Sequence, residues 1–343
     1  MILKQDYRKQ LIILKIKYKK HMPKTILVTG SAGFIGFHTS KTLLDRGDIV
    51  IGIDNFNNNV NQKNLKEDRN KILEKHKNYK IHKVDICDKD ALEKIFKDEK
   101  IDAICHLAAQ AGVGYSFENP QIYAKTNYEG TSNIFEEAKI NNIKRIVYAS
   151  SSSVYGVNEI PWQEDQDVNN QINPYGVSKR ACELLANVYR NTYKLNITGL
   201  RFFTVYGPWG RPDMAYYIFA YKISRGEKIT VRTHPTDTVK RDFTYIDDIV
   251  NGILASIDKN TKEPVYNLGN SNPENLDKLI SVIEENLGKK AQKIIEPLNP
   301  GEFVKNSADT NKAKQDLGFE PKTNLKEGLK KFTDWYKEYY KIK

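Results

Sequence analysis

The chain has few cysteines and no long apolar run. Only Cys87, Cys105 and Cys182 occur among its 343 residues, and their spacing matches no metal-ligand motif. An odd, scattered set of cysteines forms no disulfide framework, so we expect the protein to reside in a reducing cytoplasm. We also expect no metal site. No uninterrupted apolar stretch approaches the roughly 18 residues that a membrane-spanning helix requires. We therefore expect no stable membrane association.

The net charge of +11 does not by itself indicate a nucleic-acid partner. The first 21 residues carry seven Lys and Arg against one Asp, which leaves only +5 for residues 22–343. Because the chain shows no basic patch interleaved with aromatics and no known module, we expect no nucleic-acid binding. Residues 1–21 lack the cleavage site of a signal peptide. They could form a basic amphipathic segment on a membrane surface, but we favour an unstructured extension ahead of an alternative start at Met22.

After Met22, short apolar runs alternate with amphipathic segments. The runs TILVTG, IVIGID, IHKVDI, AICHLA, RIVYAS and ITGLRF are typical of strands. Their alternation with helical segments predicts an α/β fold with a doubly wound parallel sheet. From about residue 205 the pattern loosens. We predict a cofactor-binding domain over 22–204 and a smaller C-terminal α/β substrate lobe over 205–343, with a segment near 240–260 packing back on the first domain.

The stretch TILVTGSAGFIG places Gly30, Gly33 and Gly36 after a predicted strand and at the start of a predicted helix. Glycines there permit a tight turn and the close approach of a pyrophosphate to the helix N-terminus, as in Rossmann-type folds. The spacing is GxxGxxG rather than GxGxxG. Asp54 follows 24 residues after Gly30, at the end of IVIGID. A carboxylate there would bind the adenosine ribose and repel a 2′-phosphate, which favours NAD over NADP; the alternative is a loop cap.

The stretch NPYGVSKRACELLA places Tyr175 and Lys179 four residues apart, on one face of a predicted helix. A free phenol, with a pKa of about 10, is a poor base at neutral pH. A neighbouring ammonium and a positively charged nicotinamide would favour the phenolate. The stretch SSSSVYG follows the strand RIVYA and supplies hydroxyls at the sheet edge where open α/β sheets bind ligands. A serine there could hydrogen-bond the substrate oxygen that the phenol deprotonates.

Five ordered motifs, GSAGFIG, HLAAQAG, SSSSVYG, YGVSK and RDFTYIDD, resemble the extended short-chain dehydrogenase/reductase family in its NAD-dependent nucleotide-sugar epimerase branch. The resemblance runs from about Lys24 to the C-terminus. It implies Tyr175 as the catalytic acid/base, Lys179 as the modulator of its acidity, and Ser151, with Ser152 beside it, as the hydroxyl partner. It also implies cofactor contacts by Gly30, Gly33, Phe34, Ile35, Gly36, Asp54, Asn55, Asp85, Ile86, Leu107, Ala108, Ala109, Asn127, Tyr175 and Lys179.

The stretch RFFTVYGPWGRPDMA, residues 201–215, is similar to the UDP-glucuronate 4-epimerases, as are AAQAGV and RDFTYIDDIV. The resemblance implies that Thr204 and Arg211 bind the hexuronate carboxylate, that Arg241 contacts the diphosphate, and that Glu302 contacts the uridine ribose. A guanidinium binds a carboxylate bidentately, but it serves equally well on a phosphate or in a structural salt bridge. Gly114 stands where hexuronate epimerases usually carry arginine. Neutral UDP-hexoses therefore remain alternative substrates.

We predict NAD-dependent 4-epimerisation of UDP-glucuronate to UDP-galacturonate through a transient 4-keto sugar. The alternatives are a UDP-glucose or UDP-N-acetylglucosamine 4-epimerase and a non-catalytic NAD-binding protein. The non-catalytic alternative is disfavoured by the presence of Ser151, Tyr175 and Lys179. The related dehydratases carry Asp-Glu before VYG and the decarboxylases carry Glu there. This chain has two serines, which protonate a leaving hydroxyl poorly, so both activities are disfavoured.

Family resemblance also implies a homodimer. The interface would form from the helix that carries Tyr175 and the helix around residues 121–140. The apolar positions Leu184, Leu185 and Val188 are compatible with it, and they would serve an ordinary core equally well.

Overall fold

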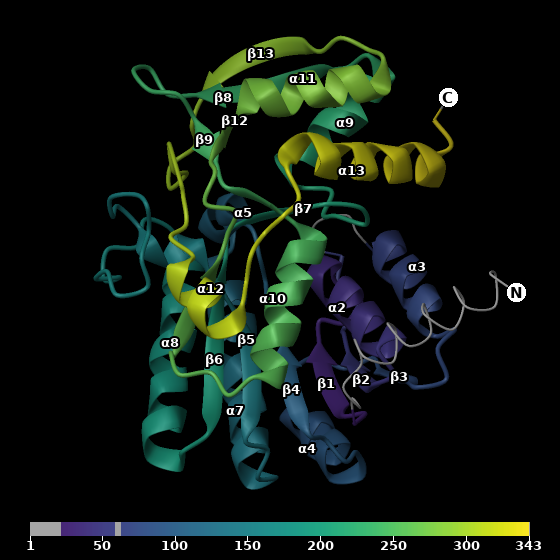
Figure 1. Ribbon diagram of the computed structural model, residues 1–343, viewed down its shortest axis with the longest axis vertical. Helices are drawn as coiled ribbons and strands as arrows, with labels where there is room; N and C mark the ends of the chain where they lie inside the picture. The colour runs from purple at the N-terminus through teal and green to yellow at the C-terminus, as the bar shows by residue number, and fades with distance from the viewer. Residues whose placement is uncertain (1–21, 59–62, 343) are drawn as a thin grey trace, which may run out of the picture.

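The computed structural model describes residues 22–58 and 63–342, so the prediction for residues 1–21 lies outside the described residues. A seven-stranded sheet forms the centre of the molecule (Figure 1). Its strands are β1 (Thr25–Thr29), β2 (Ile49–Ile53), β3 (Tyr79–His82), β4 (Ala103–His106), β5 (Arg145–Ser151), β6 (Asn196–Phe202) and β11 (Val265–Leu268). All are parallel, in the order β11-β6-β5-β4-β1-β2-β3.

The strands are apolar because both faces of the sheet are covered. β1, β4 and β6 are buried along almost their whole length, which explains their unbroken apolar runs. Two details differ from the sequence-based expectation. β3 begins at Tyr79 and ends at His82, earlier than the run IHKVDI suggests. The edge strand β11 comes from beyond residue 204 and was not predicted, since its four residues are too short to show a pattern.

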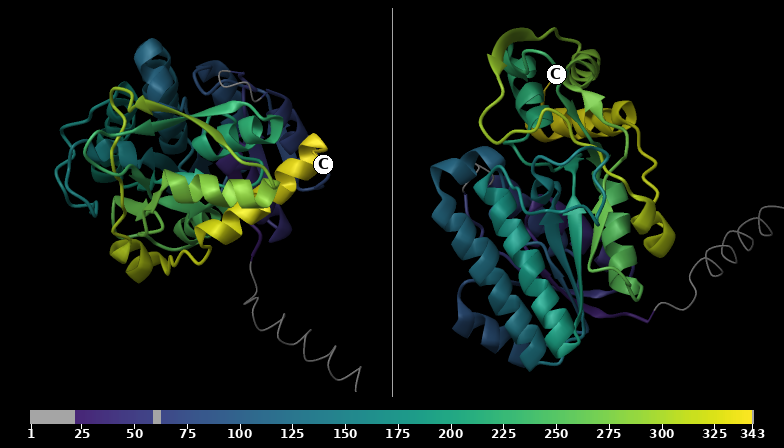
Figure 2. Two further views of the ribbon diagram at one scale, coloured as in Figure 1. Left: turned by 90° about the horizontal axis from the view of Figure 1, so that it is seen from above. Right: turned by 90° about the vertical axis from the view of Figure 1, so that its left-hand side faces the viewer.

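Helices cover each face of the sheet. One face carries α2 (Phe34–Asp45), α3 (Lys63–Leu73) and α10 (Ile246–Asp258), and the other carries α4 (Lys89–Asp98), α7 (Gly130–Ile140) and α8 (Pro174–Tyr193). In α4, for example, Asp88 caps the N-terminus by accepting from the Ala91 N–H, and Leu92, Ile95 and Phe96 are buried. The right-hand view of Figure 2 shows the three layers edge-on. The predicted doubly wound fold is confirmed.

The strand order reverses between β1 and β4. From β1 the chain builds outward through β2 and β3, and β4 then returns to the other side of β1. The loops that leave the carboxyl ends of β1 and β4 therefore diverge and leave a crevice between them. Ligands of open α/β sheets bind at this switch point.

A C-terminal lobe lies above the carboxyl ends of the strands (Figure 1). It contains α9 (Ala215–Arg225), β8 (Lys228–Thr233), α11 (Leu276–Leu287), β13 (Gln292–Pro297) and α13 (Leu325–Tyr340). β8 pairs in parallel with β13, and α11 packs against α9 and α13. The short elements are α5 (Val113–Glu118), α6 (Pro120–Tyr123), a π-helix η1 (Ala124–Glu129), a 3-10 helix η2 (Ser152–Tyr155), β7 (Thr204–Tyr206), β9 (Lys240–Arg241), β10 (Phe243–Tyr245), β12 (Glu274–Asn275) and α12 (Asn311–Leu317).

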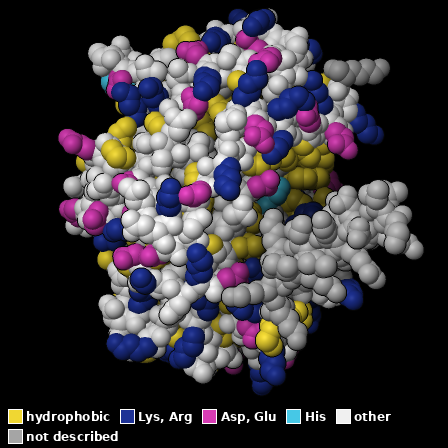
Figure 3. All heavy atoms as spheres, viewed as in Figure 1, with side chains coloured by type: hydrophobic (Ala, Val, Ile, Leu, Met, Phe, Trp, Pro, Cys, Tyr) yellow, Lys and Arg dark blue, Asp and Glu magenta, His cyan; other side chains and the backbone are white. Residues whose placement is uncertain are grey.

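The helix α10 returns from the lobe to the sheet. It contacts α2 and the strands β5 and β6, and Ile249 and Ile253 are fully buried there. Within the described ranges no helix is both long enough and apolar enough to cross a membrane. Figure 3 shows basic and acidic side chains interspersed over the face in view.

Candidate active site

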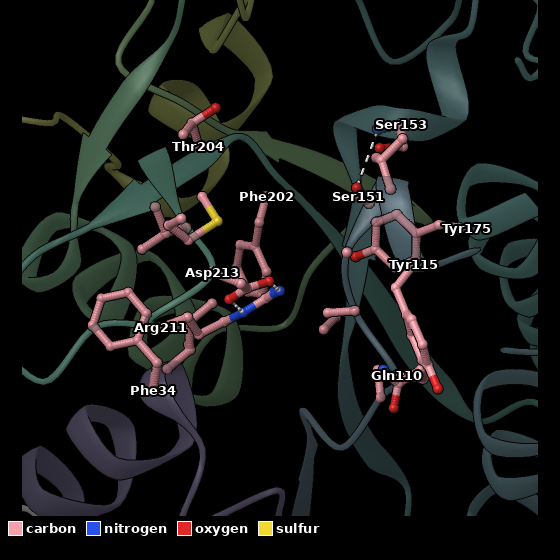
Figure 4. Close-up of a pocket in the computed structure, with 18 of the residues that line it drawn as sticks. Phe34, Gln110, Tyr115, Ser151, Ser153, Tyr175, Phe202, Thr204, Arg211 and Asp213 are labelled. Carbon is pink, nitrogen blue, oxygen red and sulfur yellow. Dashed lines mark hydrogen bonds and ion pairs between the residues drawn. The ribbon is translucent and has the colours of Figure 1, made fainter. Parts of the chain in front are cut away.

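A cavity of about 890 Å³ lies at the carboxyl ends of the central strands, beneath the C-terminal lobe. All the predicted site residues except Asn127 line it. In Figure 4, Ser151 and Tyr175 lie on one side of the cavity, and Thr204 and Arg211 lie across from them. The fold therefore brings together groups that are more than 20 residues apart in the sequence.

The glycine loop leaves no room for side chains. Gly30 has a φ of +69°, and a Cβ there would lie 2.8 Å from the backbone nitrogen of Ala108. A Cβ on Gly36 would lie 2.0 Å from the Gly30 carbonyl oxygen. Gly33 is the N-cap of α2, so no side chain covers the first N–H groups of that helix. This arrangement fits the pyrophosphate of a dinucleotide.

Asp54 directly follows β2, and hydrogen bonds already orient its buried carboxylate. Its Oδ1 accepts from the Phe56 N–H at 2.8 Å and from Lys66 Nζ at 3.0 Å, and its Oδ2 accepts from the Ala32 N–H at 3.2 Å. Lys66 is also buried and lines the cavity. Lys66 was not predicted from the sequence, because only the packing of α3 brings it to the end of β2.

The next predicted cofactor contacts are held by hydrogen bonds between loops. Asn55 donates from Nδ2 to Asp85 Oδ2 at 2.8 Å. Burial opposes ionisation of Asp85, but hydrogen bonds from Cys87 and Asn55 outweigh it and lower the pKa of this carboxyl. Asn127 lies behind the cavity wall, where its amide bonds the backbone of Gln110 and donates to Ser178 Oγ at 2.8 Å. Its position supports the wall rather than lining it.

Tyr175 lies in the first turn of α8. The Asn173 side chain caps this helix by accepting from the Gly176 N–H at 2.7 Å, and Pro174 occupies the first helical position. Lys179 follows one turn later on the same face, as predicted. Its buried Nζ donates to the Ala149 carbonyl on β5 at 2.7 Å. An ammonium has three protons, so two remain for a ligand in the cavity.

The serines differ in their partners. Ser150 donates to Glu183 at 2.6 Å, and Glu183 forms a buried ion pair with Arg201 at 2.8 Å, so the Ser150 hydroxyl is committed to the core. Ser151 Oγ accepts from the Ser153 N–H at 3.1 Å, which leaves its own proton available for a ligand oxygen. Ser152 lines the cavity beside it. These contacts separate Ser151 from its neighbours in a way that four consecutive serines alone do not.

Arg211 already binds a carboxylate. Its Nε donates to Asp213 Oδ1 at 3.0 Å, and its Nη2 donates to Oδ2 of the same side chain. Burial opposes the charge of the guanidinium, but Asp213 outweighs it and raises the pKa of Arg211. Asp213 also lines the cavity and was not selected from the sequence. Its position two residues after Arg211 in RPD was a local signal that could have found it.

The two remaining predicted substrate contacts lie at the lobe end of the cavity. Arg241 donates from Nη1 to the carbonyls of Lys240 and Val304, and burial lowers its pKa while Glu302 opposes the shift. Glu302 accepts from Asn299 Nδ2 at 3.1 Å. Lys222 lines the same end, and its ammonium group makes no hydrogen bond or ion pair with any residue that the structure describes.

Comparisons with known proteins agree on one family. Residues 27–332 match the family model described as GDP-mannose 4,6 dehydratase. UDP-glucuronate 4-epimerase 4 of Arabidopsis thaliana is 44% identical over 333 residues, which are 92% of this chain and 76% of that protein. The Bacillus cereus UDP-glucuronic acid 4-epimerase, solved with UDP-glucuronic acid and NAD, has a TM-score of 0.85 and 35% identity, covering 92% of this chain and all of that chain. The Thermotoga maritima UDP-glucose 4-epimerase, solved with UDP-glucose, has a TM-score of 0.83 and 30% identity, covering 92% of this chain and 99% of that chain.

The chain belongs to the NAD-dependent nucleotide-sugar epimerases of the extended short-chain dehydrogenase/reductase family. It is therefore an isomerase with NAD as its cofactor, and the resemblance seen in the five motifs is confirmed. The glycine loop and the carboxylate of Asp54 are the groups that a Rossmann-type fold offers to such a cofactor.

Although the matching family model is named after a dehydratase, the residues of this epimerase differ from the dehydratase pattern. Ser152 and Ser153, both buried, occupy the positions of the dehydratase Asp-Glu pair. Neither hydroxyl is an effective acid or base for removing water. The local chemistry therefore agrees with the epimerase relatives rather than with the name of the model.

Proposed function

We propose that this NAD-dependent UDP-sugar 4-epimerase acts on a UDP-hexuronic acid and interconverts UDP-glucuronate and UDP-galacturonate. The observation that carries the proposal is the bidentate contact of Arg211 with the carboxylate of Asp213, at the cavity wall opposite Tyr175. The same guanidinium fork can bind the C6 carboxylate of a hexuronate. The similarity to the Arabidopsis and Bacillus UDP-glucuronate 4-epimerases supports this choice of substrate.

In the proposed reaction Tyr175 accepts the proton of the sugar 4-hydroxyl and later returns it to the 4-keto oxygen. Bound NAD⁺ would supply the acceptor for the C4 hydride and its return to the opposite face. Ser151 donates its free proton to the same sugar oxygen, because its Oγ already accepts from Ser153. Lys179, anchored on the Ala149 carbonyl, places its positive charge on the same face of α8 as the phenol.

The remaining roles follow from position in the cavity. Thr204 and Arg211 would hold the sugar acid, which keeps the β-keto acid intermediate in an orientation that disfavours loss of CO₂. Arg241 and Lys222 would supply positive charge for the diphosphate, and Glu302 would accept from the uridine ribose. The cofactor would lie on the part over 22–204 and the nucleotide sugar on the part over 205–343.

A substrate panel tests the proposal. Incubation of the purified protein with UDP-glucuronate, followed by NMR of the products, is expected to show UDP-galacturonate. UDP-glucose and UDP-N-acetylglucosamine serve as neutral comparisons, because Gly114 lines the cavity with open space where an arginine would stand. Turnover of a neutral sugar without any galacturonate product would replace the proposal with a neutral-hexose epimerase.

We further propose a homodimer through α8 and its neighbour α7. Val177, Leu184 and Val188 recur on one face of α8, and each is about half exposed. A Leu184→Glu, Val188→Glu double variant is expected to halve the mass measured by light scattering, because two charges would enter an apolar interface. A parent protein that is already monomeric, or a variant that stays dimeric, contradicts this interface.

A further inference from the structure

Three consecutive backbone carbonyls directly before Arg211 accept hydrogen bonds from two side chains, the buried Arg69 and the partly buried His38. His38 Nε2 donates to the Pro208 carbonyl at 2.9 Å. Arg69 Nη2 donates to the Trp209 carbonyl and, at 3.1 Å, to the Gly210 carbonyl. Neither donor belongs to the C-terminal lobe: His38 lies on α2 and Arg69 on α3.

Both donors are attached to the cofactor-binding loop. His38 lies in the helix that begins at Phe34, directly after the glycine loop. The second terminal nitrogen of the Arg69 guanidinium, Nη1, donates at 3.1 Å to the carbonyl of Ala32 within that loop. Arg69 has no exposed surface, and its two terminal nitrogens donate to main-chain carbonyls, whereas its buried Nε has no hydrogen-bond partner among the described residues. A buried guanidinium loses free energy with every N–H group that has no acceptor, so the three carbonyls that Nη1 and Nη2 reach hold Arg69 in place, and Arg69 holds them.

The segment between the donors and Arg211 has little freedom of its own. Trp209 adopts a φ of +59°, in the left-handed region that non-glycine residues rarely occupy. Its ring packs against Phe37, Trp335 and Tyr339, with centroid distances between 5.1 and 5.7 Å. The donors therefore fix a strained segment whose next residue is Arg211.

We infer that Arg69 and His38 are positioning residues that hold Arg211 at the sugar-binding wall of the cavity. The inference rests on the proposed role of Arg211 toward the sugar acid. The same guanidinium also donates to Ala32 in the cofactor loop. A displacement of either the cofactor loop or the segment before Arg211 would therefore disturb the other. Neither residue touches the reacting atoms; each acts through the main chain before Arg211.

A double-mutant cycle separates positioning from general stability. Arg69→Lys keeps the charge but loses the fork, and it is expected to lower kcat/KM for UDP-glucuronate by about tenfold, mainly through KM. In an Arg211→Ala background the same change is expected to lower kcat/KM less than about twofold, because the group it positions is gone. Equal losses in both backgrounds would overturn the inference.

His38 provides a second pair of variants if Arg69→Lys does not fold. His38→Leu removes the donor to Pro208 and is expected to raise KM about fivefold, whereas His38→Gln, which keeps an N–H donor, is expected to stay near the parent value. Matched effects of leucine and glutamine would contradict the role of the hydrogen bond.

Hydrogen exchange keeps the inference independent of the substrate proposal. Arg69→Lys and His38→Leu are each expected to speed amide exchange in residues 205–213 about tenfold while leaving α8 unchanged. If the parent does not convert UDP-glucuronate, the proposed function fails and the exchange result alone decides the positioning. If amide exchange in residues 205–213 is the same in both variants as in the parent, the inference is wrong, whatever the substrate.

Discussion

Replacement of Tyr175 by phenylalanine is expected to lower kcat by about 10²- to 10⁴-fold, the usual contribution of a positioned general acid/base. The phenol is the proposed acceptor of the sugar hydroxyl proton, because the Lys179 ammonium has donors only and the Ser150 hydroxyl of β5 already donates to Glu183. The measurement is the initial rate of epimerisation at saturating nucleotide sugar.

A matched variant controls for the loss of a tyrosine hydroxyl. Tyr193 lies at the other end of the same helix, is 42% exposed and does not line the cavity, so Tyr193→Phe is expected to turn over at the parent rate. The amount of bound NAD and the Tm of Tyr175→Phe should match those of the parent, because the ring remains. A Tyr175→Phe variant as active as the parent would refute the assignment of this phenol.

Replacement of Arg211 by alanine is expected to lower kcat/KM for UDP-glucuronate by roughly 30- to 160-fold, equivalent to about 2–3 kcal/mol for a truncated charge pair. The loss should lie toward the low end, because Asp213 already occupies the guanidinium and must be displaced by the sugar carboxylate. Steady-state kinetics with the acidic and the neutral nucleotide sugar measure the effect.

The comparison between the acidic and the neutral sugar shows whether Arg211 binds the sugar carboxylate or the diphosphate. Activity on UDP-glucose, where detectable, is expected to change much less, since that sugar has no carboxylate. Arg225 is an exposed arginine at the end of α9, outside the cavity lining, so Arg225→Ala controls for the general loss of one arginine. Equal losses on acidic and neutral sugars would mean that Arg211 serves the diphosphate, the alternative left open by the sequence.

Much of the cofactor end of the site could be predicted from short motifs. The glycine loop is a strand–turn–helix unit whose function depends on backbone conformation within seven residues, and Gly30 and Gly36 leave no room for a Cβ in the structure. Tyr175 and Lys179 are likewise related by one helical turn. Such local relations are visible in a sequence because the spacing itself determines the geometry.

The choice among four neighbouring serines could not be made in this way. The core ion pair of Glu183 and Arg201 uses Ser150, and the 3-10 turn of η2 orients Ser151. Glu183 comes from α8 and Arg201 from β6, so the selection depends on how a helix packs against the sheet. No periodicity in the sequence reports that contact.

The sequence by itself determined the alternating α/β order, the glycine loop between the first strand and helix, the placement of Tyr175 and Lys179 on one helix face, and the family of the chain. Only the tertiary structure decided that Lys66 reaches Asp54, that β11 completes the sheet, and that His38 and Arg69 donate hydrogen bonds to the backbone before Arg211. The physical reason is separation along the chain. Local geometry follows from residue spacing, whereas partners 12 to 170 residues apart meet only when burial of the apolar faces brings their elements together.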